Sequence, residues 1–405
     1  MFRRSFLPLA AASLAAASAR PKAALIITEY RKNSHADVIA GRLLGGYEYD
    51  GKRTEPRVHV VSMFTDQTPA NDMSRAMAAR HNVAIYPDVR GALTLGGGSL
   101  AVDGVVLIGE HGNYPENEMG QKLYPRHRLF REIVRVYEAS GRAVPTFSDK
   151  HLSTDWDKAK WMYDASRRLG FPFLAGSSVP IAWRRPELEL APGTRVRNAV
   201  ATAYGGKEAY GFHALESLQC MVERRRGDES GVQAVQCLDG AAVWNWADAH
   251  PWSLTLMDAA NARSQTRKPG NVRDKVKDPS VFVVRYRDGL EAAVFLLNGH
   301  IEDFNFAASL EGRAEPVSTL MWLQPARYYA HFATLTHYIE ELILQRKEPY
   351  PVERTLLTTG ILAAAMDSAY QKGRALETPH LDVRYRAPVG SLYNRGPVPP
   401  LEADA

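Results

Sequence analysis

The sequence predicts an α/β fold in which an N-terminal, Rossmann-like parallel sheet domain precedes an α+β domain with a mainly antiparallel sheet. Up to about residue 180, short apolar runs alternate with amphipathic stretches, the pattern of parallel strands joined by helices. Beyond that point, strand-like runs follow one another through turns such as Asp288-Gly289. The 405 residues are 45% apolar, which is enough to fill the cores of two such units.

The first half is expected to form strands at 23–28, 58–64, 83–86, 104–109, 143–149 and 171–175. Helices are expected between them at 34–44, 72–81, 127–140 and 156–169. Because strands and helices alternate, helices should cover both faces of a parallel sheet.

The second half is expected to form strands at 195–204, 232–237, 281–286, 292–297 and 305–310. Helices at 211–225, 251–263, 325–344 and 352–372 would cover that sheet. We therefore predict a Rossmann-like domain over 20–180, an α+β substrate and oligomerisation domain over 181–390, and a C-terminal tail over 391–405. A homo-oligomer formed through the second sheet stays open as an alternative to a monomer.

Residues 1–19 have the composition of a signal peptide. Arg3 and Arg4 precede an alanine-rich apolar run that ends in the small-residue site Ala17-Ser18-Ala19. The paired arginines resemble a twin-arginine signal, which predicts export to the periplasm or the outside of a bacterial cell. The run is too short for a good membrane span, so no span is expected once it is removed. The two cysteines, Cys220 and Cys237, leave a single disulfide open.

The charge balance argues against a nucleic-acid partner. The net charge of +5 includes the two arginines of the leader, and basic residues elsewhere are interspersed with acids. A small-molecule ligand is expected instead.

Lys150 is the most informative candidate for chemistry. It follows an apolar run that ends at Asp149, and a helix and a buried strand come after it. Ligands of open α/β sheets collect outside the carboxyl ends of the strands, so a lysine there is a candidate proton donor. The alternative is an ordinary solvated loop lysine.

The order of these features resembles the Gfo/Idh/MocA oxidoreductases, the family around glucose-fructose oxidoreductase and inositol dehydrogenase. Two hallmarks carry the resemblance: a strand ending in Asp149-Lys150-His151 where the family has Glu-Lys-Pro, and a helix with His213 three residues before Glu216. Further matches are Asp66, Asp103 to Val106, His127, Gly141 and the closing helix from 353 to 372.

The resemblance implies an oxidoreductase that acts on a sugar, sugar derivative or polyol with NAD or NADP. His213 would be the base, Lys150 would stabilise the developing oxyanion, and Glu216 would orient the imidazole or bind a hydroxyl. The cofactor would be held by Thr28, Ser34, Asp66 and Glu110.

The loop 110–118 after the fourth long strand is dense in polar side chains. It places His111 and Tyr114 where a sheet presents its strand ends, and with His151 they are expected to bind the substrate. Imidazole and carboxylate groups also suit a divalent metal, but the short fixed spacing of a metal motif is missing. We therefore assign no metal ligand and keep a metal as the alternative.

The sequence departs from the family pattern at the turn that would bind the nucleotide, and this affects the cofactor prediction more than the fold prediction. The segment 27–34 after the first strand contains no glycine, and Glu29 would repel a phosphate unless Arg31 or Lys32 compensates. His151 replaces the family proline, and Ala209 replaces an aspartate. A cofactor-free or metal-assisted lyase or hydrolase on the same scaffold, or a non-catalytic sugar-binding protein, thus remains as the alternative function.

Overall fold

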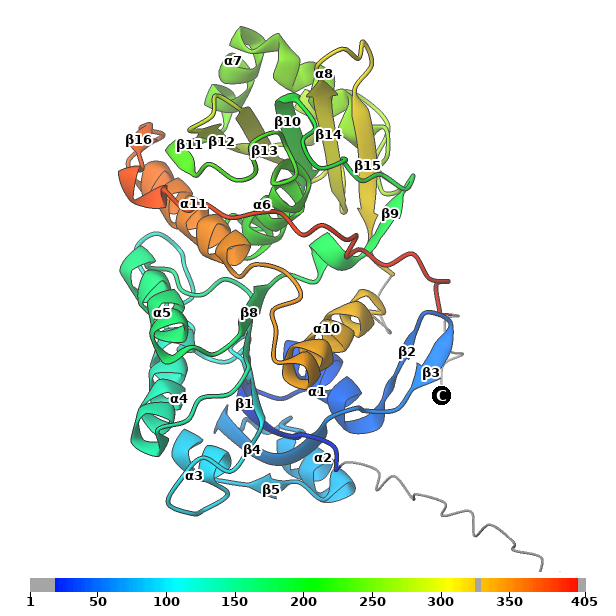
Figure 1. The fold of residues 1–405 in the computed structure, drawn as a ribbon. Coiled ribbons are helices and arrows are strands. Elements are labelled where there is room, and N and C mark those ends of the chain that lie inside the picture. The colour runs from blue at the N-terminus through cyan, green and yellow to red at the C-terminus, as the bar shows by residue number, and fades with distance from the viewer. Residues whose placement is uncertain (1–18, 325–328, 400–405) are drawn as a thin grey trace, which may run out of the picture.

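The computed structural model describes residues 19–324 and 329–399. Nearly all of the expected signal peptide, the first residues of the helix expected from 325, and the end of the tail lie outside the described residues. Two sheets with their helices are stacked one above the other, and their junction runs across the middle of the molecule (Figure 1).

The lower sheet consists of six parallel strands in the order β5-β4-β1-β6-β7-β8. β1 lies at the centre and is buried from Ala23 to Glu29, pairing with β4 on one side and β6 on the other. The strands are β1 (Lys22–Glu29), β4 (His59–Gln67), β5 (Ala84–Ile85), β6 (Gly104–Ile108), β7 (Thr146–Asp149) and β8 (Phe173–Gly176). The predicted Rossmann-like parallel sheet is confirmed.

Helices cover both faces of this sheet (Figure 1). One apolar layer contains residues of α3 (Val89–Thr94), α4 (Arg126–Ser140) and α5 (Trp156–Leu169). The other layer contains residues of α1 (His35–Gly45), α2 (Ser74–His81) and α10 (His331–Gln345). A short ribbon of β2 (Tyr47–Tyr49) and β3 (Lys52–Thr54) follows α1.

Helix α10 belongs to the second half of the sequence but packs on the first sheet. Leu335, Ile339 and Leu342 share an apolar cluster with Leu25 of β1. The fully buried carboxylate of Glu340 accepts hydrogen bonds from residues near the start of β4. The chain therefore crosses back over the boundary expected at residue 180, so the first unit is discontinuous in sequence.

The upper sheet has eight strands in the order β16-β11-β12-β13-β10-β14-β15-β9. All described pairs are antiparallel except β10 with β13, which confirms a mainly antiparallel sheet. The strands are β9 (Trp183–Arg185), β10 (Val196–Ala203), β11 (Val232–Asp239), β12 (Ser280–Tyr286), β13 (Glu291–Leu296), β14 (Phe304–Leu310), β15 (Val317–Trp322) and β16 (Leu376–Glu377).

Two pairs of helices enclose the upper sheet. α6 (Ala209–Val222) and α11 (Glu353–Tyr370) lie between the two sheets, whereas α7 (Ala241–Ala249) and α8 (Pro251–Asn261) cover the outer face (Figure 1). A single turn, α9 (Val272–Lys275), follows α8. Helix α7 was not predicted. Its Trp244 and Trp246 pack against the apolar cluster between the outer helices and the upper sheet, away from the junction of the two sheets. Cys220 and Cys237 are both buried and unpaired.

Candidate functional site

The candidate site is a cavity of about 680 Å³ between the carboxyl ends of the lower sheet and the upper unit. Its size is in the range of pockets that hold small ligands. The lower unit contributes Lys150 and Glu110, and the upper unit contributes His213 from α6. The remaining polar and aromatic lining includes His35, His111, Tyr204, Tyr210, Gln265, Thr266, Glu302, Asp303, Phe304, Trp322, Tyr329, His331 and Phe332.

Lys150 lies immediately after β7 with a left-handed backbone, φ 68°. Its N–H donates to the carbonyl of Gly176 at 3.2 Å, so the chain is fixed at the point where the side chain leaves the sheet. His111, after β6, has φ 70°. Left-handed conformations are costly for residues with a side chain, and here two of them lie together at the same sheet edge.

The two predicted catalytic groups meet across the junction of the units. The Nζ of Lys150 lies 2.6 Å from the Nε2 of His213. The other ring nitrogen of His213, Nδ1, lies 2.6 Å from the hydroxyl of Ser177, which follows β8. Lys150 is 5% exposed, so this contact is shielded from bulk water.

Glu110 provides the negative charge beside this pair. Its carboxylate accepts from Arg126 Nη2 at 2.5 Å and lies 3.7 Å from the Nζ of Lys150. Burial alone would raise the pKa of Glu110, but Lys150 and Arg126 lower it well below its usual range. Glu110 is thus an anion that balances two cations, not a proton donor.

Two histidines that line the cavity, His213 and His111, are neutral at pH 7. Burial, together with the charge of Lys150, holds the pKa of His213 well below its usual range. Burial and the neighbouring His35 lower the pKa of His111 to about 4. Neutral imidazoles have a free lone pair, so they can accept a proton from a bound hydroxyl group.

Glu216 is placed beneath the cavity rather than in its lining. It is fully buried, accepts from the Thr358 hydroxyl at 2.6 Å, and accepts from the backbone N–H of Ser177 at 3.4 Å. Burial raises its pKa. The structure shows no direct contact of Glu216 with the imidazole, because the carboxylate points toward α11 and the end of β8.

Of the residues expected to bind a cofactor, only Glu110 lines the cavity. Thr28 is fully buried and donates to the carbonyl of Glu110 at 2.7 Å, which ties the ends of β1 and β6 together. Ser34 caps α1 by accepting from the N–H of Asp37. Asp66 accepts from Tyr114 Oη at 2.7 Å and from Arg128 Nη2 at 2.6 Å.

The loop after β6 reaches across to the end of β4. Gln67 and the backbone of Asn113 exchange two hydrogen bonds, of 2.8 and 3.0 Å, next to the contact of Tyr114 with Asp66. We call these four residues the β4 clasp. It spans the strand ends where a Rossmann-like sheet usually receives a nucleotide.

The three residues expected to bind substrate are dispersed. His111 lines the cavity, whereas Tyr114 belongs to the β4 clasp. His151 lines a neighbouring cavity of about 390 Å³ on the other side of Lys150, where its Nε2 lies 2.8 Å from Glu208 and 3.0 Å from Arg126.

Several residues of the site were missed. Ser177 had no signal beyond being a small polar residue directly after a strand. Trp322 lies at the end of β15, with its Nε1 donating to Gln265 at 3.0 Å and Arg185 stacked on its ring. No strand was predicted at 317–322, so nothing placed this tryptophan at a site.

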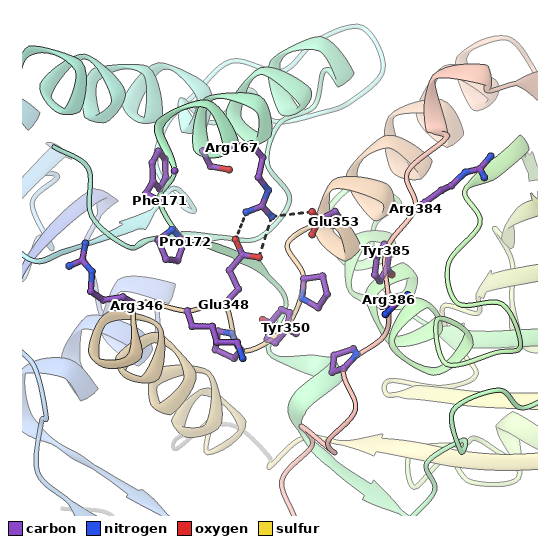
Figure 2. A pocket seen from close by; sticks show the side chains of 16 residues that line it. Arg167, Phe171, Pro172, Arg346, Glu348, Tyr350, Glu353, Arg384, Tyr385 and Arg386 are labelled. Carbon is purple, nitrogen blue, oxygen red and sulfur yellow. Dashed lines mark hydrogen bonds and ion pairs between the residues drawn. The ribbon is translucent and has the colours of Figure 1, made fainter. Parts of the chain in front are cut away.

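A second large cavity, of about 720 Å³, lies where α5, the loop before α11 and the C-terminal segment meet (Figure 2). Its two carboxylates, Glu348 and Glu353, are both bonded to Arg167 (Figure 2). The residues that line it include no histidine. It therefore offers no proton-transfer pair comparable with Lys150 and His213.

Within residues 19–324 and 329–399, no group of three or more histidine, cysteine or acidic side chains is arranged to hold a metal ion. No helix in the same described part is long and apolar enough to cross a membrane.

No family model and no curated protein matches the sequence. The structure, in contrast, is similar to solved oxidoreductases. GenD2 from gentamicin A biosynthesis, solved with NAD, is 12% identical with a TM-score of 0.56, and 92% of this chain and 99% of that chain are covered. Myo-inositol dehydrogenase from Lactobacillus casei, solved with NAD(H) and myo-inositol, is 10% identical with a TM-score of 0.53, covering 88% and 96%. The chain has the inositol dehydrogenase fold.

The myo-inositol 2-dehydrogenase from Lactobacillus plantarum has the same fold, with 10% identity, a TM-score of 0.54 and coverage of 89% and 99%. These neighbours confirm the predicted likeness in fold to the Gfo/Idh/MocA oxidoreductases over most of the chain. In this inositol dehydrogenase fold, Lys150 and His213 come from the two different units and converge between them.

Proposed function

We propose that the protein is an oxidoreductase that acts on a hydroxyl group of a carbohydrate-type substrate with a nicotinamide cofactor. The observation that carries the proposal is the buried 2.6 Å contact between Lys150 and His213, at the strand ends and inside a cavity shared by both units. The fold neighbours solved with NAD, one of them also with myo-inositol, support the cofactor and the substrate class.

The residues of the chain account for the proton half of such a reaction. A substrate hydroxyl that replaces the direct contact of Nζ with Nε2 and binds to both can lose its proton to the neutral imidazole of His213. The ammonium group of Lys150 then stabilises the negative charge on the substrate oxygen, and Glu110, 3.7 Å away, holds that group in place. A bound nicotinamide ring would supply the hydride acceptor.

The fit to that cofactor differs between its two ends. The 680 Å³ cavity has room for a nicotinamide ring beside a small polyol, and Arg31 and Lys32 bring positive charge to the start of α1. Arg31 also neutralises Glu29 at 2.6 Å. At the adenosine end, ribose hydroxyls would compete with Tyr114 and Arg128 for the carboxylate of Asp66 in the β4 clasp, which already accepts from both.

That clasp favours a second candidate function, a redox-neutral lyase or hydrolase that uses the same pair for proton transfer alone. Turnover of a polyol or glycoside without any nicotinamide, in protein that releases none on denaturation, would establish this candidate instead.

The deciding experiment has two parts. The absorption spectrum and mass of any small molecule released from the denatured full-length protein identify a retained cofactor. Added NAD or NADP with a panel of polyols and sugars should then yield the reduced cofactor. Lys150→Met is expected to lower kcat by about a hundredfold or more. Lys158→Met, at an exposed position of α5, should leave turnover unchanged. Equal activity of both variants would contradict the proposal.

We also propose that residues 1–19 direct export through the twin-arginine pathway. The paired Arg3 and Arg4 before an apolar run support this. A reporter enzyme fused to the leader should reach the periplasm, and replacing both arginines by lysine should retain it in the cytoplasm; export of both forms would contradict it.

A further inference from the structure

Both ring nitrogens of His213 are held by groups of the lower unit. Nε2 faces Lys150, which follows β7, and Nδ1 faces Ser177, which follows the adjacent strand β8. The imidazole itself stands on α6 of the upper unit. His213 thus reaches across the junction between two neighbouring strand ends.

The chemistry of these partners decides where the ring proton lies. An ammonium group has donors only, so Nε2 must accept from Lys150. A neutral imidazole then carries its hydrogen on Nδ1 and donates it to the Ser177 hydroxyl. The same oxygen accepts from the backbone N–H of Val179 at 3.0 Å, which leaves it with acceptor geometry toward both groups.

We propose that Ser177 is the positioning residue that fixes His213 in its Nδ1–H tautomer, so that an unprotonated Nε2 is presented beside Lys150. This inference rests on the proposed proton-transfer function of the site. It assigns a role to a residue that neither the sequence pattern nor the fold neighbours identify.

The backbone at Ser177 is held by close contacts with Thr355 and Glu216. Gly176, directly before it, has φ 120°, and a Cβ there would come within 2.6 Å of Thr355 Oγ1 and 2.7 Å of Glu216 Oε2. The N–H of Ser177 donates to that same Glu216 oxygen. Glu216 therefore acts on the imidazole through the backbone of Ser177, which explains a buried carboxylate one helical turn from His213.

Whether the group beside Nδ1 is neutral or charged decides the protonation state that the imidazole of His213 favours. A carboxylate beside Nδ1 would favour the imidazolium, whereas a hydroxyl leaves the ring neutral. Of the other groups that face His213, Lys150 and His35 oppose a second positive charge and Glu110 favours it, and the neutral His331 and the ring of Tyr210 also lie beside it. The lysine thus carries the charge of the pair, and the imidazole provides its basic lone pair.

The tautomer can be measured on the full-length protein without any substrate. Nitrogen-15 histidine NMR at neutral pH should show His213 with a protonated Nδ1 and an unprotonated Nε2, the resonance being assigned by its loss in His213→Gln. Ser177→Thr, which keeps the hydroxyl, should preserve this signature. Ser177→Ala should lose it, because the ring no longer has an acceptor for its Nδ1–H and is free to turn away from Lys150. Ser217→Ala is the matched control, because its hydroxyl donates within α6 to the Ala214 carbonyl and does not touch the ring. A protonated Nε2 in the unaltered protein would overturn the inference, as would an unchanged signature in Ser177→Ala.

Turnover provides the second readout. Ser177→Ala should lower kcat by about tenfold to a hundredfold with little change in KM, and Ser177→Thr should restore most of it. Ser177→Asp should move the acidic limb of the pH profile upward by about one unit or more, because a carboxylate stabilises the imidazolium. A profile unchanged by Ser177→Asp would contradict the assignment. If the NMR signature holds while no substrate is turned over, the proposed function fails and the tautomer assignment stands.

Discussion

At the scale of single residues, the cavity lining includes an imidazole whose surroundings keep it uncharged at neutral pH. His331, at the start of α10, is 5% exposed and its Nδ1 has no hydrogen-bond partner among the described residues. Burial and the nearby Arg42 lower its pKa to about 3. A neutral imidazole is thus kept in the lining, where it adds polarity to the site without charge.

This shift predicts a pH dependence of stability. The unfolded chain protonates His331 near its ordinary pKa of 6.5, but the folded protein does not until about 3. The unfolded state therefore binds more protons between these values, and the free energy of unfolding should fall as the pH falls from 6.5, by about 1.4 kcal/mol per pH unit for this group. His331→Leu should flatten the slope in urea titrations by that amount. His59→Leu, at an exposed position of β4, should not, and equal slopes in both variants would contradict the prediction.

Individual residues also show what the sequence could and could not reveal. Lys150 and His213 were predictable because each belongs to a local pattern, a strand end and a helix motif. The contact between them was not, since it joins residues 63 positions apart across two units. Ser177 was missed because a serine after a strand is common, and its function depends on which ring reaches it. Thr28 and Ser34 were assigned by their places at the end of β1 and before α1, but their side chains satisfy backbone groups instead.

At the scale of elements, α10 is the helix that most alters the simple order of two domains. Glu340 accepts from Tyr47 Oη at 2.7 Å, from Arg57 Nε at 2.9 Å and from the Arg57 N–H at 2.6 Å, with its side chain fully buried. The hydrophobic periodicity predicted a helix here but not the sheet that it covers. Its partners lie more than 280 positions away in sequence.

Replacing this carboxylate should be costly. Glu340→Gln leaves Arg57 without its buried counter-ion and turns an amide toward several donors, so the free energy of unfolding should decrease by about 3 kcal/mol. Its neighbour Glu341 also pairs with Arg57, but nearer the surface. Glu341→Gln should cost less than about 1 kcal/mol. Similar losses in the two variants, measured by urea unfolding, would show that α10 is not anchored through Glu340.

The β4 clasp is the second element with a testable consequence. Tyr114→Phe removes the hydroxyl that donates to Asp66 and keeps the ring that fills the loop. If a ribose must replace that hydroxyl, the variant should bind NAD more tightly, by about two- to tenfold, the equivalent of one hydrogen bond. Calorimetry on both proteins provides the measurement. Weaker binding by Tyr114→Phe would mean that the tyrosine contacts the nucleotide instead of competing with it.

At the scale of the whole molecule, the two units share one apolar core. A single cluster of buried residues includes Ile26 and Leu107 of the lower sheet together with Phe212 and Phe306 of the upper unit. The alternation of elements predicted two sheets but gave no information on this continuity, which arises because α6 and α11 lie between them. The division into units is therefore one of topology, with packing shared across the junction.

This continuity predicts cooperative unfolding. Far-ultraviolet circular dichroism follows both units, whereas tryptophan fluorescence reports mainly on α5 and on the outer helices α7 and α8 of the upper unit. The two urea transitions should superimpose, as expected when one unit cannot unfold without exposing the core of the other. Two separated midpoints would show that the shared core does not couple the units.

The attachment of the imidazole to two strand ends of the opposite unit has one last consequence. Any hinge motion that admits a ligand must pull His213 away from Lys150 and Ser177 together, leaving its ring free to rotate and to exchange its proton with water. An open molecule would therefore be inactive. Activity would return only when the two units close on the ligand, because the same movement that encloses the ligand also restores the orientation and tautomer of His213.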